Sequence, residues 1–220
     1  MRNESYPREF EISPYSLADA RFVESTAEQD ECLIWQPPRT LVVIGKGSDL
    51  SLEVKIEHVL HDNIAVSRRA TGGCAVVLSP RMTVASFVLR REDQLPSREY
   101  FRRFNQIIIH ALERQGITGL SHRGISDIAL GDRKLAGTAI YRNRHLVFFH
   151  AIINVASGTE EMERYLKHPP RTPDYRLNRS HREFVTSLAE QGYDLSVSQF
   201  SADIETEFSR TVFAIPELAS

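Results

Sequence analysis

The chain has 220 residues, of which 41% are hydrophobic and 25% are charged, and its formal net charge at pH 7 is -2. This length and apolar content suffice for a substantial core within the size range of one domain, so we expect residues 1–220 to form a single unit. The small net charge excludes a bulk attraction to nucleic acid or to anionic lipid, and we expect neither as a partner.

The sequence contains no apolar run near the roughly 18 to 20 residues that a membrane helix needs. Its polar start also lacks the apolar core of a signal peptide. We therefore expect a cytoplasmic protein that crosses no membrane. The two cysteines, Cys32 and Cys74, are too few for a disulfide framework and have no second thiol at metal-site spacing, so we expect both to be reduced.

The first half of the chain alternates between strand-like and helix-like patterns, after a start (residues 1–30) whose pattern is poorly defined. Strands are expected at residues 40–44 and 83–89, and helices at residues 16–28, 52–61 and 97–115. Ser97 is the expected N-cap of the longest of these helices. Within that helix, His110 lies among isoleucines in the sequence and is expected to be packed rather than catalytic.

The second half begins with a predicted β-hairpin, because Gly131-Asp132 suits a two-residue turn. Strands are expected at residues 127–130, 133–141 and 146–155, and helices at residues 160–166 and 180–191 and from Ser198 or Ser201 to Arg210. Ser180 and Glu183 have the spacing of a capping box, and residues 211–220 are expected to be a tail. Together these patterns predict an α/β fold with a mixed sheet flanked by helices.

One stretch has the composition of an anion-binding loop: Arg68-Arg69-Ala70-Thr71-Gly72-Gly73 lies between two strand-like runs. Adjacent glycines allow positive φ and let backbone N–H groups approach a ligand. The arginines and the Thr71 hydroxyl add donors for carboxylate or phosphate oxygens. Taken alone, the pattern also fits an ordinary turn with a solvated pair of arginines.

A second stretch, Gly131-Asp132-Arg133-Lys134-Leu135-Ala136-Gly137-Thr138-Ala139, follows downstream. In their order and separation, the two stretches resemble the lipoate-protein ligase family, which is related to the biotin ligases. The resemblance covers about residues 35–188 and implies the α/β fold of the biotin/lipoate ligase class. A biotin ligase is a poorer match, because residues 68–74 lack the Gly-Arg-Gly pattern of that family.

The resemblance implies an ATP-dependent lipoate-protein ligase. Such enzymes join lipoate or octanoate to ATP as an acyl-adenylate and then transfer the acyl group to a lysine of a lipoyl domain. Lys134 matches the motif lysine and is the expected catalytic residue, whose ammonium would bridge the carboxylate and the α-phosphate. Asp127 matches the acidic residue that helps to hold Mg²⁺, although Ser126 replaces the asparagine that usually precedes it.

The resemblance also implies a set of substrate-binding positions on both stretches. These positions are Arg69, Thr71, Gly72, Gly73, Cys74, Ala75, Gly137, Thr138 and His150. His150 resembles the first residue of a His-Gly pair, but Ala151 replaces the glycine, so a packed histidine fits as well as a site residue.

Two other functions remain open. Octanoyltransferases of the same superfamily use a cysteine nucleophile and need neither ATP nor metal. The position where such a cysteine is expected, near residues 121–125, has none. The remaining candidate is Cys74, which replaces a family glycine and which we expect to be packed rather than nucleophilic.

The second alternative is a non-catalytic subunit that binds lipoyl domains. Ligases of the family often carry a further C-terminal domain, and this chain stops soon after its last expected helix. A separate accessory polypeptide is therefore an expected partner, together with the lipoyl-domain acceptor.

A basic, proline-rich segment at residues 164–182 contains one acidic residue, Asp174. We interpret it as a segment that covers the pocket or docks an acidic lipoyl domain. A solvated loop is the alternative interpretation.

Overall fold

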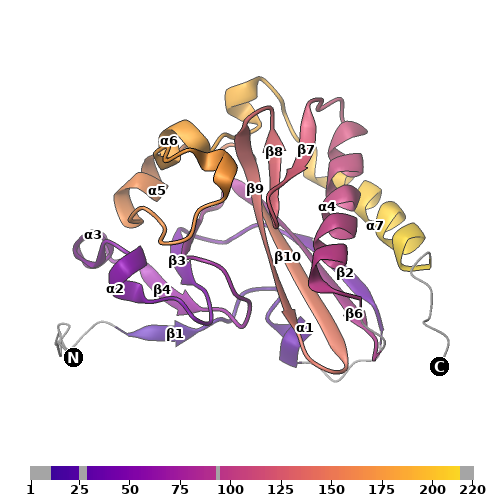
Figure 1. The fold of residues 1–220 in the computed structure, drawn as a ribbon, viewed down its shortest axis with the longest axis horizontal. Coiled ribbons are helices and arrows are strands. Elements are labelled where there is room, and N and C mark those ends of the chain that lie inside the picture. The colour runs from indigo at the N-terminus through magenta and orange to yellow at the C-terminus, as the bar shows by residue number, and fades with distance from the viewer. Residues whose placement is uncertain (1–10, 25–28, 93–94, 214–220) are drawn as a thin grey trace.

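The computed structural model describes residues 11–24, 29–92 and 95–213, whose framework is two β-sheets (Figure 1). The smaller sheet contains, in spatial order, β1 (Ile12–Pro14), β4 (Ala65–Arg68), β3 (Leu41–Ile44) and β5 (Val76–Leu78). It is a mixed sheet, because β4 runs parallel to both β1 and β3 whereas β5 runs antiparallel to β3.

The larger sheet is antiparallel throughout. Its order is β2 (Glu31–Trp35), β6 (Met82–Arg90), β10 (Leu146–Asn154), β9 (Arg133–Arg142), β8 (Asp127–Leu130) and β7 (Leu120–Arg123). The central strand β10 pairs along its whole length with β6, which gives this sheet a rigid middle.

Two long helices, α4 (Ser97–Glu113) and α7 (Val197–Phe213), cover one face of the larger sheet (Figure 1). Their apolar side chains meet those of the sheet in the largest core cluster, which includes the buried aromatic residues Phe87, Phe104, Phe149 and Phe200. Burial of one such side chain contributes about 1.5 to 3 kcal/mol, so this face dominates the stability of the fold. Among the described residues, no helix has the length and apolar character to cross a membrane.

Short helices complete the fold. They are α1 (Arg21–Glu24), α2 (Leu50–Glu53), α3 (Ile56–His61), α5 (Glu160–Tyr165) and α6 (His181–Phe184), with the 3₁₀ helices η1 (Asp174–Arg176) and η2 (Ala189–Gln191). Of these, α2, α3 and α5 pack on the smaller sheet, whereas α1 packs on β6 and β10 of the larger sheet. A second apolar cluster joins β3 and β4 to α2, α3 and α5. It fixes the smaller sheet against the segment that follows β10.

The predicted α/β fold flanked by helices is confirmed, but the described residues form two sheets instead of one mixed sheet, and only the smaller is mixed. Also confirmed are the expected β8–β9 hairpin, whose Gly131 has a φ of 63°, and the helix at α5. The helix expected from Ser97 is present, but Pro96 is its N-cap and no side chain caps it. Ser97 is instead its first residue.

The single helix expected at residues 52–61 is wrong, because the chain forms α2 and α3 with a break between them. At the break, Val54 is fully buried, has extended backbone angles and pairs with Leu166 in an isolated antiparallel bridge. A tertiary contact with a segment more than 100 residues away therefore overrides the local helical pattern.

The helix expected at residues 180–191 is also too long. The capping box of Ser180 and Glu183 is present, but α6 ends at Phe184. Val185 then becomes extended and forms a parallel bridge with Lys134. The helix therefore ends before Val185, whose extended backbone pairs with β9 instead.

Three further expectations are corrected. The start of the chain is better defined than its sequence indicates, because Asp19 and Phe22 are fully buried. His110 is not packed, since its side chain is 48% exposed on the outer face of α4. The expected tail overlaps α7, which extends to Phe213; residues 25–28 of the first expected helix and residues 214–220 lie outside the described residues.

Candidate functional site

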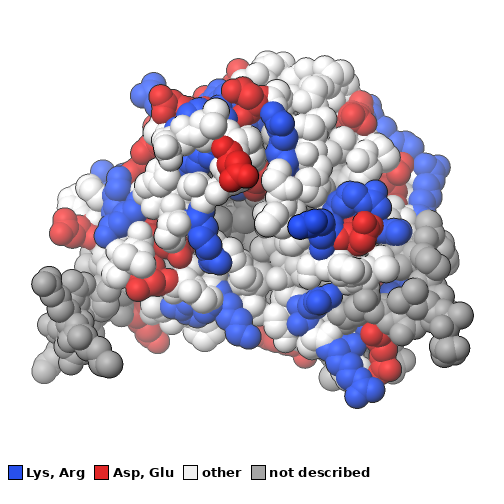
Figure 2. All heavy atoms as spheres, in the orientation of Figure 1, with Lys and Arg blue, Asp and Glu red and all other residues white. Residues whose placement is uncertain are grey.

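A pocket of about 870 Å³ lies where the loop after β4, the β8–β9 hairpin and the segment between α5 and α6 meet. We call residues 69–75 the glycine loop and residues 166–180 the arm. Lysine and arginine side chains border the recess in the middle of this face (Figure 2). The two sequence stretches that suggested a site, more than 50 residues apart, therefore face one cavity.

Nearly all the predicted site residues line this pocket. Those that do so are Arg69, Gly72, Gly73, Cys74, Ala75, Asp127, Lys134, Gly137, Thr138 and His150. Thr71 is the exception, because its side chain is buried behind the glycine loop.

Lys134 and Asp127 form an ion pair inside the pocket. Lys134 Nζ lies 2.7 Å from Asp127 Oδ1, and the Asp127 side chain is 7% exposed. The other carboxylate oxygen accepts a hydrogen bond of 2.9 Å from the hydroxyl of Tyr175, which belongs to the arm. Burial, and then the Asp127 charge, raise the pKa of Tyr175 above its ordinary value, so the phenol stays protonated and donates.

The backbone around Lys134 explains how its side chain reaches Asp127. Asp127 on β8 pairs directly with Gly137 on β9. A Cβ atom at Gly137 would lie 2.9 Å from Lys134 Nζ, so the side chain of Lys134 passes over a position that must lack a side chain. The Lys134 carbonyl also accepts from Thr186 N at 2.9 Å, which holds this end of β9 against the segment after α6.

Arg69 holds the glycine loop from inside. Its side chain is buried, and its Nη2 donates to the carbonyls of Gly72 and Cys74 at 2.8 and 2.9 Å while Nη1 donates to Val43 O at 3.1 Å. Burial lowers the pKa of Arg69 to about 10, which leaves it charged at neutral pH. In this arrangement the guanidinium shapes the loop, and its direct contact with a ligand stays a prediction.

Glu53 holds the same loop from the other side. Its buried carboxylate accepts hydrogen bonds from Ala75 N and from Ser48 Oγ. Ser48 Oγ also lies 3.1 Å from Gly73 O. The backbone N–H of Ala75, one of the predicted binding positions, is therefore already used by the protein.

The tip of the glycine loop keeps its donors free. Within the described ranges, the N–H groups of Gly72, Gly73 and Cys74 donate to no protein atom. Gly73 has a φ of 93°, a conformation that favours glycine. Three backbone donors fixed by the surrounding bonds form a concave site suited to an anion.

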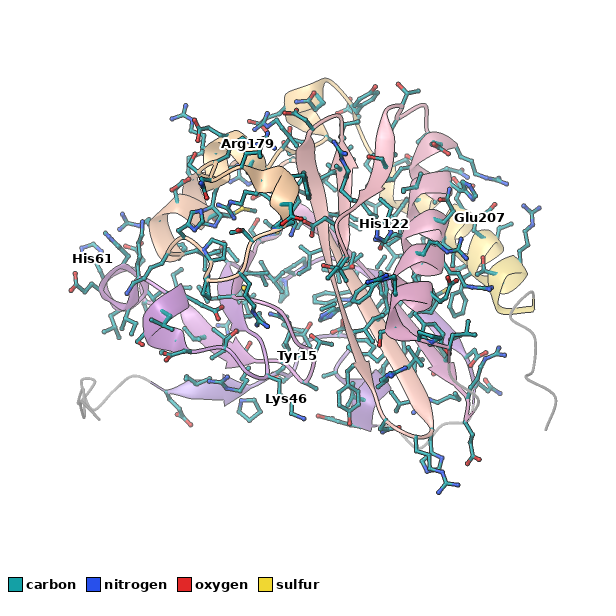
Figure 3. All side chains as sticks on the ribbon, in the orientation of Figure 1. Tyr15, Lys46, His61, His122, Arg179 and Glu207 are labelled. Carbon is teal, nitrogen blue, oxygen red and sulfur yellow. The ribbon has the colours of Figure 1, made fainter. Side chains whose placement is uncertain are left out.

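A buried chain of hydrogen bonds lies behind the loop. Thr71 Oγ1 is 3.0 Å from His150 Nε2, and His150 Nδ1 is 3.2 Å from Asp19 Oδ2. Asp19 also accepts from the hydroxyls of Tyr15 and Ser86 at 2.7 and 2.8 Å. Tyr15, labelled in Figure 3, also meets the His150 ring edge-on, with ring centroids 6.5 Å apart.

The charge state of Asp19 fixes the direction of these bonds. Burial acts to raise the pKa of Asp19, but the hydrogen bonds from His150, Tyr15 and Ser86 outweigh it and hold the pKa below its ordinary value. Because a carboxylate only accepts, His150 Nδ1 must carry a proton. His150 thus both lines the pocket and belongs to the packed core, the two alternatives that its sequence left open.

Cys74 lines the pocket without the surroundings of a nucleophile. Its thiol is partly exposed, and its Sγ lies 4.0 Å from the carbonyl oxygen of Arg171. Among the described residues, no histidine or carboxylate bonds to this sulfur to take its proton. A cysteine mechanism therefore lacks its base.

The donor set of the pocket fits a magnesium ion held mainly by a substrate. The described residues contain no group of three or more His, Cys, Asp or Glu side chains placed to hold a metal. Mg²⁺ in phosphate-binding sites commonly uses one or two carboxylates, with phosphate oxygens and water completing its shell. Asp127 provides one such carboxylate in the pocket.

A family profile, curated relatives and solved structures are similar to this chain. The profile of the lipoyl protein ligase A/B catalytic domain matches residues 15–209. The chain belongs to this family. It is similar to lipoate-protein ligase A of Psychrobacter cryohalolentis, with 26% identity over 196 residues, which are 88% of this chain and 56% of that protein. The chain spans about half the length of the curated relatives it matches.

Solved structures share the fold of this lipoyl protein ligase A/B catalytic domain. A bi-partite lipoate protein ligase from Thermoplasma acidophilum, from work on that ligase and its E2 lipoyl domain, superposes with a TM-score of 0.75 and 21% identity over 89% of this chain and 76% of that chain. A lipoate-protein ligase A bound with ATP gives a TM-score of 0.73 and 21% identity over 89% and 78% of the two chains.

Three polar residues of this lipoyl protein ligase A/B domain were not anticipated from its sequence. Glu53, Asp19 and Tyr175 contact the glycine loop, His150 and Asp127, respectively. The sequence features that could have predicted these residues are weak. Tyr175 lies in the basic segment that was expected to cover the pocket. Asp19 and Glu53 lie in short polar stretches without a motif.

Proposed function

We propose that this chain is the catalytic part of an ATP-dependent lipoate-protein ligase. It activates lipoate or octanoate as an acyl-adenylate and transfers the acyl group to a lysine of a lipoyl domain. The observation that carries the proposal is the Lys134–Asp127 pair facing a glycine loop with free N–H groups across one pocket. Family membership and a relative named lipoate-protein ligase A support it, as does the shared fold of a ligase bound with ATP.

In the first step, the carboxylate of the acid attacks the α-phosphorus of ATP and pyrophosphate leaves. Negative charge gathers on the oxygens around that phosphorus. Lys134 provides a mobile ammonium beside this point, and the N–H groups of Gly72 and Gly73 provide fixed donors. A charge-assisted hydrogen bond in such a site contributes about 1.5 to 3 kcal/mol.

Magnesium would be held by Asp127 together with phosphate oxygens, and it would supply charge neutralisation for the phosphates. Two other residues of this chain orient the Asp127 carboxylate for that role. Tyr175 and Lys134 hold the Asp127 carboxylate in one orientation through bonds to its two oxygens.

In the second step, the amine of the acceptor lysine attacks the acyl carbon and AMP leaves. An amine with a pKa of about 10.4 is neutral in about 1 molecule in 2,500 at pH 7, which costs about 4.6 kcal/mol. Either Asp127, which lines the pocket, or the released phosphate accepts the proton. The glycine-loop donors stabilise the charge on the acyl oxygen.

The acceptor is proposed to be a lipoyl domain, because the similar Thermoplasma acidophilum ligase was studied with its E2 lipoyl domain. That ligase is described as bi-partite, and a separate accessory subunit remains part of our proposal. We further propose that the chain acts in the cytoplasm and that its two cysteines stay reduced.

One experiment tests the activity directly. The purified chain is mixed with a lipoyl domain and either lipoate with Mg-ATP or an octanoyl carrier protein, and the acceptor is weighed by mass spectrometry. We expect the mass of one lipoyl group with the first mixture alone. Transfer from the carrier protein without ATP, abolished by Cys74→Ala, would establish the cysteine mechanism instead.

A companion measurement separates a ligase from a binding subunit. Lipoate-dependent exchange of labelled pyrophosphate into ATP reports the first step without an acceptor. We expect exchange that survives treatment with a thiol-blocking reagent. Its absence, both with and without a lipoyl domain and an accessory subunit, would leave a non-catalytic role.

A further inference from the structure

Arg176 is a buried cation that faces the pocket without an acidic partner. Its side chain lines the pocket, and the residue is 4% exposed. Nε donates to Arg179 O at 2.8 Å, whereas Nη2 has no hydrogen-bond partner. No carboxylate of the described residues lies within ion-pair distance of this guanidinium.

The position of Arg176 is fixed by the arm. Arg179 donates back to Arg176 O at 3.1 Å, and Arg179 is itself anchored to Asp132 on the β8–β9 turn at 2.9 Å. Both guanidinium groups lie over the ring of Phe184, at 5.0 and 5.3 Å. Figure 3 shows Arg179 in the arm, above the pocket.

Arg123, Lys167 and Arg171 also line the pocket without an ion pair among the described residues, but unlike Arg176 they are exposed to solvent. Several other cations near the pocket have partners. Lys134 is paired with Asp127, Arg179 with Asp132, and Arg164 with Asp62. Arg69 is buried as well, but its two terminal nitrogens donate to three backbone carbonyls. Arg176 is therefore a buried cation of the pocket without an ion pair, and one of its terminal nitrogens has no hydrogen-bond partner. Glu163 and Asp127 act on its charge only from beyond ion-pair distance.

An unpaired buried charge costs a protein several kcal/mol. Burial lowers the pKa of Arg176, because the charged guanidinium loses hydration inside the protein. The same charge acts on a neighbour: burial first, and then Arg176, lower the pKa of His181 to about 4, so His181 is neutral at pH 7 and adds no second positive charge beside Arg176. A ligand that brings its own anion would remove the penalty.

We propose that Arg176 binds a polyphosphate, either free pyrophosphate or the terminal phosphates of a nucleoside triphosphate. The inference rests on the proposed function, which requires a pyrophosphate leaving group. In the proposed function Lys134 serves the α-phosphate, so the further negative charges of such a ligand need a further cation, and Arg176 provides one inside the pocket. The planar fork of arginine matches two oxygens of one phosphate group.

The test compares Arg176→Met with a matched control, Arg182→Met, which removes an exposed arginine of α6 at the edge of the arm. Binding of inorganic pyrophosphate, Mg-ATP, AMP and lipoate to the full chain is measured by calorimetry, and unfolding temperatures are recorded with and without each compound. Pyrophosphate and Mg-ATP report the two sources of the polyphosphate, while AMP and lipoate report the rest of the pocket.

We expect Arg176→Met to weaken pyrophosphate and Mg-ATP binding about tenfold or more, because charge-assisted bonds are lost. AMP and lipoate binding should stay within about twofold of the original, and Arg182→Met should bind all four compounds normally. Without ligand, the unfolding temperature of Arg176→Met should fall by no more than about 3 °C, because the variant also loses an unfavourable unpaired charge.

Unchanged pyrophosphate and Mg-ATP affinity in Arg176→Met would overturn the inference, as would an equal loss of AMP and lipoate binding. If Arg176→Met does not fold, Arg176→Lys is measured instead, because lysine keeps the positive charge but lacks the planar guanidinium. Polyphosphate affinity equal to that of the original chain would refute phosphate binding by the guanidinium. A loss of affinity confined to pyrophosphate and Mg-ATP would support it. An original chain that binds polyphosphate through Arg176 but transfers no lipoate would refute only the proposed function.

Discussion

Lys134 Nζ lies 2.7 Å from Asp127 Oδ1, an ion pair that joins two strands of one hairpin at the floor of the pocket. The lysine reaches its partner by passing over Gly137, which pairs with Asp127 in the sheet. The ion pair thus depends on the register of β8 with β9, on the absence of a side chain at Gly137 and on Tyr175, which donates to the other carboxylate oxygen of Asp127. Each of these dependences can be tested.

Replacing Lys134 with alanine should lower the rate of adenylate formation by about one to two powers of ten, because one charge-assisted bond is lost in the transition state. Lipoate-dependent pyrophosphate exchange measures this step. Lys46→Ala, which removes an exposed lysine after β3, is the control and should keep the original rate. Full exchange by Lys134→Ala would rule out the catalytic role.

Gly137→Ala should reduce activity without unfolding the protein. The new Cβ would lie 2.9 Å from Lys134 Nζ, and the flexible end of that side chain can move away from Asp127. Single-turnover adenylation should therefore slow while the unfolding temperature stays within about 3 °C of the original. An unchanged rate would mean that the position of the ammonium over this strand is unimportant.

Gly45→Ala should damage the glycine loop itself. A Cβ atom there would lie 2.0 Å from the carbonyl oxygen of Gly73, so backbone must shift. Overpacking of this kind costs about 1 to 3 kcal/mol of unfolding free energy, and the displaced loop should also bind ATP more weakly. Gly47→Ala is the matched control, because nothing lies within 4 Å of its Cβ position; equal stability of both variants would contradict the close approach.

Asp19→Asn should disturb His150. The carboxylate accepts from three groups, whereas an amide of the same size has one accepting oxygen, so at least one buried donor loses its partner at a cost of about 1 to 3 kcal/mol. Chemical denaturation measures the loss, and the ¹⁵N chemical shifts of the His150 ring should show the proton moving from Nδ1. The exposed Asp194→Asn is the control; unaltered ring shifts in Asp19→Asn would refute the fixed tautomer.

His181 should make stability depend on acid. Its pKa is lowered from 6.5 to about 4 in the folded protein, so between these values the unfolded chain binds the proton and the folded protein does not. Stability therefore falls as the pH decreases from about 6.5 to about 4, by about 3 kcal/mol for this group. The free energy of unfolding, measured by denaturation at several pH values across this range, should change less with pH in His181→Gln than in the exposed control His58→Gln.

The hairpin with Lys134 could be predicted because its signals are local. Gly131 supplies the left-handed turn residue, and the apolar pattern on each side gives the strands. The glycine loop was equally readable from Gly72 and Gly73. Local turn chemistry and a family motif were thus enough to predict which two stretches face one pocket.

The remaining features depend on contacts between distant segments. The break after α2 follows from the pairing of Val54 with Leu166, and the early end of α6 follows from the pairing of Val185 with Lys134. No local pattern encodes either partner. Asp19 and Tyr175 were missed for the same reason, because each gains its role from one residue on a distant strand.

These two isolated bridges have a further consequence for the segment over the pocket. One ties its beginning to the end of α2, and the other ties the chain beyond α6 to β9. The segment is in effect a strap fastened at both ends. Tyr175 and Arg179 also fasten it to the β8–β9 hairpin. An insertion or deletion between Leu166 and Pro173 would therefore leave these contacts in place and alter how far the strap reaches across the opening.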